Sequence, residues 1–130
     1  MNRTKAREYA FILLFEYRFQ PNEIEQILED FINEYEPGAQ QNYIEDVVRG
    51  VVSDISEIDQ KIESAVNGWQ IETMSCVSVA VLRLAVYEIT KRSDIPNPVT
   101  LNEAVALAKK YDGEEAAPFV NGILGAICKA

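Results

Sequence analysis

Apolar residues recur at helical spacing along most of this chain. The clearest series follows the i, i+3, i+4, i+7, i+8, i+11 pattern and consists of Ile24, Ile27, Leu28, Phe31, Ile32 and Tyr35. An earlier stripe predicts a first helix from about Thr4 to Phe19, and Asn22 is the expected cap of the helix that follows. A third helical region is expected from Asn42 to Trp69, with a bend near Ser53 and Ser56. Since no alternating pattern of strand type is longer than a few residues, the sequence predicts an all-α fold.

The second half of the chain predicts three further helices. From Val77 to Ile89 apolar residues cover nearly the whole helical circumference, so this helix is expected to be buried on most sides, with Arg83 and Glu88 as polar interruptions. We expect Arg83 to make a structural bond inside the fold.

Turn and cap signals delimit the last two helices. Thr100 and Glu103 have capping-box spacing ahead of a helix from Leu101 to Tyr111, and Asp112-Gly113 ends it. Pro118 suits the first turn of a final helix. Gly50 lies within an earlier helical pattern, where glycine costs about 1 kcal/mol relative to alanine, so we expect it to admit a neighbouring helix.

The 130 residues suit one compact domain without disulfides or metal. Cys76 and Cys128 are far apart and are expected to be core thiols in a reducing compartment. The chain has no histidine, no nucleophile motif and no glycine-rich phosphate loop, so neither catalysis nor a cofactor is expected. No leader pattern and no membrane-length apolar run is present, which favours a cytoplasmic protein without a membrane partner.

The net charge of −9 is unevenly distributed. Residues 20–65 hold twelve acidic residues against Arg49 and Lys61, whereas the first seven residues hold Arg3, Lys5 and Arg7 and no acid. Basic residues at a helix start are unfavourable to the helix dipole, so a reason other than helix stability is expected for them. Because a Debye length of about 8 Å screens the acidic region, this exposed basic cluster is a candidate for weak RNA binding.

Four blocks in the second half carry a family resemblance: Val81-Leu-Arg-Leu-Ala-Val-Tyr-Glu-Ile89, Asp94-Ile-Pro, Leu101-Asn-Glu-Ala-Val-Ala-Leu-Ala-Lys109 and Phe119-Val-Asn-Gly-Ile-Leu124. In order and spacing they resemble the NusB family of bacterial antitermination factors. The resemblance implies two roughly perpendicular three-helix subdomains, of about residues 1–68 and 69–130, within a single RNA-binding domain of residues 1–130.

The resemblance also implies roles for particular residues. The RNA-binding candidates are Arg3, Thr4, Lys5, Arg7, Phe15, Phe119 and Asn121. Phe15 and Tyr17 could stack on unpaired bases, although Tyr17 is expected in the core. The candidates for the protein-partner interface are Tyr87 and Glu88. The sequence departs from the family pattern at Thr4, where an arginine is usual, and at Gly125, where an acidic residue is common.

The function implied is that of a non-catalytic adaptor in transcription antitermination. Its partners would be single-stranded boxA RNA of ribosomal RNA leader transcripts, the small-subunit ribosomal protein NusE and, indirectly, elongating RNA polymerase, and it would oppose Rho-dependent termination. Two alternatives stay open: the RNA-binding front domain of a ribosomal RNA cytosine methyltransferase, and a homo-oligomerising structural module, for which a homodimer is one form.

Overall fold

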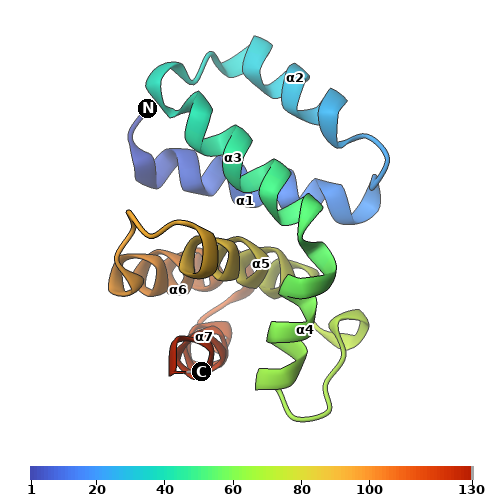
Figure 1. The fold of residues 1–130 in the computed structure, drawn as a ribbon, viewed down its shortest axis with the longest axis vertical. Helices are drawn as coiled ribbons and strands as arrows, with labels where there is room; N and C mark the ends of the chain where they lie inside the picture. The colour runs from blue at the N-terminus through green and yellow to red at the C-terminus, as the bar shows by residue number, and fades with distance from the viewer. Residues whose placement is uncertain (130) are drawn as a thin grey trace.

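The computed structural model describes residues 1–129, which form seven α-helices, two short 3-10 helices and no strand (Figure 1). The all-α prediction is therefore confirmed. The α-helices are α1 (Arg3–Phe19), α2 (Ile24–Tyr35), α3 (Gln41–Ser53), α4 (Ile55–Ala65), α5 (Cys76–Lys91), α6 (Asn97–Asp112) and α7 (Ala116–Lys129). The 3-10 helices are η1 (Gly38–Gln40) and η2 (Ile71–Thr73).

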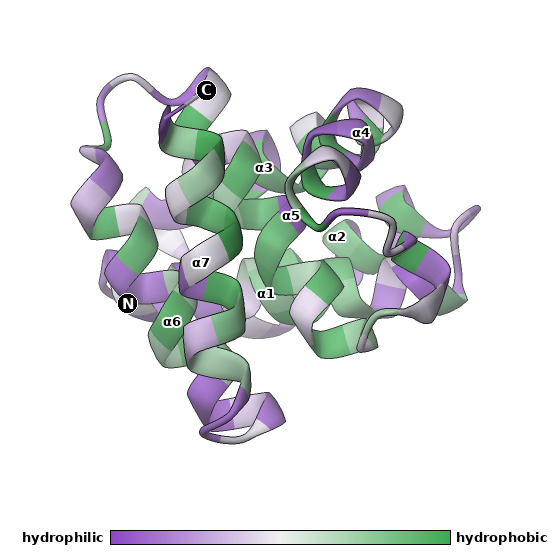
Figure 2. Cartoon of the chain, turned by 90° about the horizontal axis from the view of Figure 1, so that it is seen from below, coloured by the Kyte–Doolittle hydropathy of each residue, from purple (hydrophilic) through white to green (hydrophobic). Residues whose placement is uncertain are grey.

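Helix α5 is the centre of the molecule. Every residue from Ser78 to Glu88 is buried, as the all-round apolar pattern predicted. Its hydrophobic positions lie in the middle of the fold, and α1, α3, α4, α6 and α7 all pack against it (Figure 2). A helix enclosed on all sides needs partners for its polar groups, and Arg83 finds one in Asp59, with two N–O distances of 2.9 Å.

The helices lie in two groups about α5. Helices α1, α2 and α3 lie on one side of α5, α7 lies on the other, and α6 lies beside α5 and packs on both α5 and α7 (Figure 1). Helix α4 packs mainly on α5 and α7, which favours drawing a subdomain boundary near Asp54. The division at about residue 68 stays a prediction.

The observed helix ends agree in part with those predicted from the sequence. Asp54 separates α3 from α4 close to the predicted bend, and Gly113, with φ of 98°, follows α6 as expected. Two predicted caps are wrong. Glu23, rather than Asn22, precedes α2. Helix α6 begins at Asn97, because Pro98 suits a first helical turn, and Thr100 lies inside the helix.

Gly50 has the predicted role. An alanine Cβ at this position would overlap the ring of Tyr87, so the glycine lets α3 and α5 approach closely. Cys76 and Cys128 are free thiols, as expected, but both are only half-buried, so their expected place in the core is wrong. Over residues 1–129 the helices are too short or too polar to span a bilayer.

Candidate nucleic-acid interface

Arg7 and Glu88 form a buried ion pair. Arg7 Nε donates to Glu88 Oε2 at 2.8 Å, and the two side chains are only 4% and 0% exposed. Arg7 Nη1 also lies 3.6 Å from Glu103 Oε1. The expectation that Arg7 belongs to an exposed basic cluster is therefore wrong, because its guanidinium faces the core.

Glu88 is a hydrogen-bond acceptor for three elements of the fold. Besides Arg7 of α1, it accepts from the Tyr43 hydroxyl of α3 and from Thr100 Oγ1 of α6 at 2.8 Å. Burial and the Glu88 charge raise the pKa of Tyr43. With no exposed surface, Glu88 joins α1, α3, α5 and α6 from the inside, and its expected place on a docking face is wrong.

Tyr87, the other candidate for the protein interface, is also structural. It is 8% exposed, its ring lies on Gly50, and its hydroxyl donates to Asp46 Oδ1 at 2.9 Å. Burial and then this hydrogen bond raise the pKa of Tyr87 to about 12. Tyr87 thus positions α3 against α5, and only the edge of its side chain reaches the surface.

Glu8 accepts hydrogen bonds from two lysines and a tyrosine at the surface. Glu8 Oε2 accepts from Lys110 Nζ at 2.6 Å and from the Tyr111 hydroxyl at 2.5 Å, while Oε1 accepts from Lys5 Nζ at 3.0 Å. Hydrogen bonds from Lys110 and Tyr111 lower the pKa of the Glu8 carboxyl from 4.5 to about 2. We call Lys5, Glu8, Lys110 and Tyr111 the Glu8 cluster.

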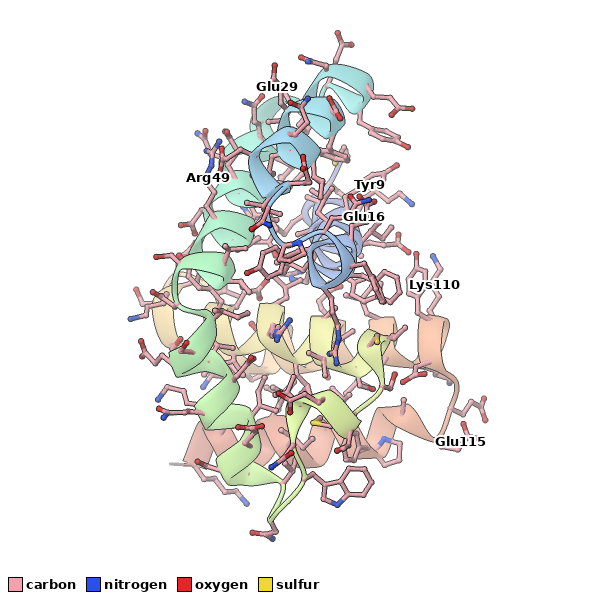
Figure 3. All side chains as sticks on the ribbon, turned by 90° about the vertical axis from the view of Figure 1, so that its right-hand side faces the viewer. Tyr9, Glu16, Glu29, Arg49, Lys110 and Glu115 are labelled. Carbon is pink, nitrogen blue, oxygen red and sulfur yellow. The ribbon has the colours of Figure 1, made fainter. Side chains whose placement is uncertain are left out.

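The Glu8 cluster presents positive charge to solvent. The side chain of Glu8 is 11% exposed, whereas those of Lys5 and Lys110 are 51% and 61% exposed. Each ammonium carries three donors, so phosphate oxygens can be bound outside the contact with Glu8. Tyr9 and Lys110 project on the same side of the molecule, opposite Arg49 (Figure 3). Lys110 and Tyr111 were not predicted from the sequence, where their only signal is the basic pair Lys109-Lys110 at the end of α6.

Arg3 and Thr4 lie at the start of α1 and have partners on other helices. Arg3 Nε donates to Gln40 at 2.7 Å, and its guanidinium lies 4.2 Å from the centre of the Tyr43 ring. Arg3 stays half-exposed. Thr4 is exposed and donates to Glu103 at 2.8 Å. These bonds fix the helix start at the surface.

The aromatic candidates belong to two separate pairs. Phe15, half-buried, contacts the exposed Phe19 with ring centres 5.3 Å apart. Phe119, at the start of α7, contacts Trp69 with ring centres 6.3 Å apart. Asn121, two residues on, is exposed, and Tyr17 is half-buried. Trp69 was expected to end a helical region, but it lies in the loop between α4 and η2.

The chain matches known proteins over nearly its whole length. Residues 4–129 match the model of the NusB family. The transcription antitermination protein NusB of Acetivibrio thermocellus is 42% identical over 130 residues, covering 99% of this chain and 90% of the relative. The protein of the same name from Thermoanaerobacter sp. strain X514 is 40% identical, with 99% and 91% covered.

Solved structures agree with the sequence matches. T. maritima NusB superposes with a TM-score of 0.92 at 37% identity, covering 99% of this chain and 92% of that structure. A chain of the crystal structure of antitermination factors NusB and NusE in complex with dsRNA superposes with a TM-score of 0.87 at 29% identity, with 99% and 98% covered. Sequence blocks, helix order and full-length similarity all agree, and the chain belongs to the NusB family.

Proposed function

We propose that the protein is a transcription antitermination factor that works as a non-catalytic RNA-binding adaptor. It binds single-stranded boxA-type RNA of ribosomal RNA leader transcripts together with the ribosomal protein NusE, and the complex joins elongating RNA polymerase in the cytoplasm to oppose Rho-dependent termination. The observation that carries the proposal is the superposition of 99% of this chain on a chain of the complex of NusB and NusE with dsRNA.

The Glu8 cluster supplies the electrostatic part of RNA binding in this proposal. Lys5 and Lys110 contact phosphates, with Arg3 and Thr4 beside them at the start of α1. Phe15, Phe119 and Asn121 remain candidates for contacts to bases. Because few cations face solvent here and the chain carries a net charge of −9, binding by this chain alone is weak and salt-dependent. A partner protein adds the remaining contacts.

The electrostatic part is tested by removing both lysines. In the Lys5→Ala/Lys110→Ala variant, RNA affinity should fall, and the slope of log Kd against log salt concentration should decrease by about 1.4, since each phosphate contact on a single strand contributes about 0.7. The matched control is Lys61→Ala/Lys91→Ala, which removes the same charge from exposed positions on α4 and α5. An equal loss of RNA affinity in the two variants would contradict an RNA-binding site at the Glu8 cluster.

The adaptor role is tested by titrating boxA RNA with and without NusE. RNA should bind more tightly when NusE is present, and linkage requires RNA to strengthen the protein pair by the same factor, typically about 5- to 150-fold. Identical RNA affinities in the two titrations would contradict the adaptor mechanism. A variant of Arg7 or Glu88 is unsuitable for this test, because those residues hold the fold together.

The methyltransferase alternative has no observation in its favour. The antitermination proteins described above are covered over 90% and 91% of their own lengths, so the similarity is to these proteins as wholes.

A further inference from the structure

The Glu8 carboxylate lies between the two exposed lysines of the Glu8 cluster. Its two oxygens serve different helices, since Oε1 accepts from Lys5 on α1 at 3.0 Å and Oε2 accepts from Lys110 on α6 at 2.6 Å. One carboxylate is thus shared by two ammonium groups. Two positive charges and one negative charge leave these three side chains with a net charge of +1.

Glu8 is the one acidic residue among the first fifteen residues of the chain. Residues 5 and 8 are neighbours on one face of a helix, which brings the Glu8 carboxylate to the Lys5 ammonium. The side chain of Glu8 is 11% exposed, so the carboxylate lies beneath the more exposed lysines rather than out in solvent. Its negative charge therefore acts directly on the part of α1 that is richest in positive charge.

The bonds around Glu8 resemble those of a bound anion. Besides the two lysines, the Tyr111 hydroxyl donates to Glu8 Oε2 at 2.5 Å. The Lys5 ammonium lies 5.2 Å from the centre of the Tyr9 ring, and the Lys110 ammonium lies 5.4 Å from that of Tyr111. Carboxylate and phosphate oxygens are bound by the same charged donors. Glu8 consequently uses donors that a phosphate would also use.

We infer that Glu8 is an internal competitor of RNA phosphate for Lys5 and Lys110, and that it limits the RNA affinity of this chain. This inference rests on the proposed function. An ammonium that turns to a phosphate shares or gives up its bond to Glu8, and the carboxylate repels the strand. The weak binding by the isolated chain, and its need for contacts from a partner protein, follow in part from this one residue.

The test is Glu8→Gln, which keeps the size and an oxygen acceptor but removes the charge. Affinity for a labelled boxA-type single-stranded RNA should rise by about 3- to 10-fold, the effect of one charge about 6 Å from a phosphate at an effective dielectric constant between about 80 and 40. The slope of log Kd against log salt concentration should become steeper by about 0.7, because one more net positive charge then faces the strand.

The matched control is Glu16→Gln, which removes the same charge from the same helix. Glu16 is exposed and lies on the same side of the molecule as Lys110 (Figure 3). It is about 12 Å from Glu8 along the helix axis. Because this separation exceeds a Debye length of about 8 Å, the control should change RNA affinity by less than about twofold. An equal gain in the two variants would assign the effect to net charge and overturn the competition.

Competition for the lysines is separated from plain repulsion by their removal. When Glu8→Gln is added to the Lys5→Ala/Lys110→Ala variant, the gain in RNA affinity should be smaller than in the wild-type background, because no lysine remains to compete for. The same gain in both backgrounds would overturn the competition. Circular dichroism melts of every variant give the temperature below which all of them are folded, and binding is measured there.

Unchanged or weaker RNA binding by folded Glu8→Gln would also overturn the inference. Weaker binding would show that Glu8 positions the lysines for phosphate instead of competing with it. In either case wild-type protein would still bind RNA, and the proposed function would stand. Failure of both wild type and Glu8→Gln to bind RNA, even with NusE, would contradict the proposed function itself.

Discussion

The buried pair of Arg7 and Glu88 should control the stability of the whole domain. The perturbation is Glu88→Ala, which leaves the Arg7 guanidinium, 4% exposed, without its main partner. The Tyr43 hydroxyl and Thr100 Oγ1 lose their acceptor in the same variant. Four helices meet at this carboxylate, so its removal should destabilise the whole fold.

The magnitude follows from the cost of an uncompensated buried charge. Breaking a buried ion pair by removing one partner costs about 3–5 kcal/mol. Arg7 keeps a weaker contact with Glu103, at 3.6 Å, which places the expected loss near the lower end, at about 3 kcal/mol. A domain of this size has a free energy of unfolding of about 5–15 kcal/mol, so the variant should still fold.

Urea denaturation followed by circular dichroism measures the effect. The exposed control Glu34→Ala, on α2, should change the free energy of unfolding by less than about 0.5 kcal/mol. A double-mutant cycle of Arg7→Met and Glu88→Gln should give a coupling energy of about 1–3 kcal/mol, because the double variant leaves no unpaired charge. A loss below about 1 kcal/mol for Glu88→Ala, together with additivity in the cycle, would refute the reasoning.

Two further predictions follow from the packing. The pKa of Glu8 is about 2 in the fold against 4.5 ordinarily, so its contribution to stability is complete above pH 4.5 and is lost as the pH falls toward 2. We therefore expect the free energy of unfolding, measured by urea denaturation at several pH values, to fall more for wild type than for Glu8→Gln between pH 4.5 and 2. Parallel pH dependences would contradict the role of the lysine and tyrosine partners of Glu8. Gly50→Ala should destabilise by about 1–3 kcal/mol through overlap with Tyr87. The control Gly122→Ala meets open space within a helix and should stabilise by up to about 1 kcal/mol in thermal melts, and equal effects at the two positions would contradict the close contact.

Helix periodicity is a local property, which is why it was readable in the sequence. The bounds of α2, Ile24–Tyr35, coincide with the apolar series, and the burial of α5 follows from its all-round apolar pattern. The expected cap of α6 was wrong because its two residues have tertiary partners. Thr100 and Glu103 have the spacing of a capping box, yet Thr100 donates to Glu88, and Glu103 accepts from Thr4.

The candidate interface was predicted only in part. Lys5 was identified, but Lys110, which binds the same Glu8 carboxylate, is about a hundred residues away, and no local pattern joins them. Trp69 was expected to end a helical apolar series, but α4 ends at Ala65 and Trp69 lies in the loop that follows. Its exposure depends on the backbone turn at Asn67 and Gly68.

The sequence by itself determined the helical class and the family blocks, since these depend on the order of residues along the chain. Only the tertiary structure decided which charges face solvent. Lys5 and Arg7 are two residues apart, and a helix of 3.6 residues per turn separates them by about 200°. One therefore lies at the surface beside Glu8, whereas the other lies in the core against Glu88, because α5 and α6 pack on that face of α1.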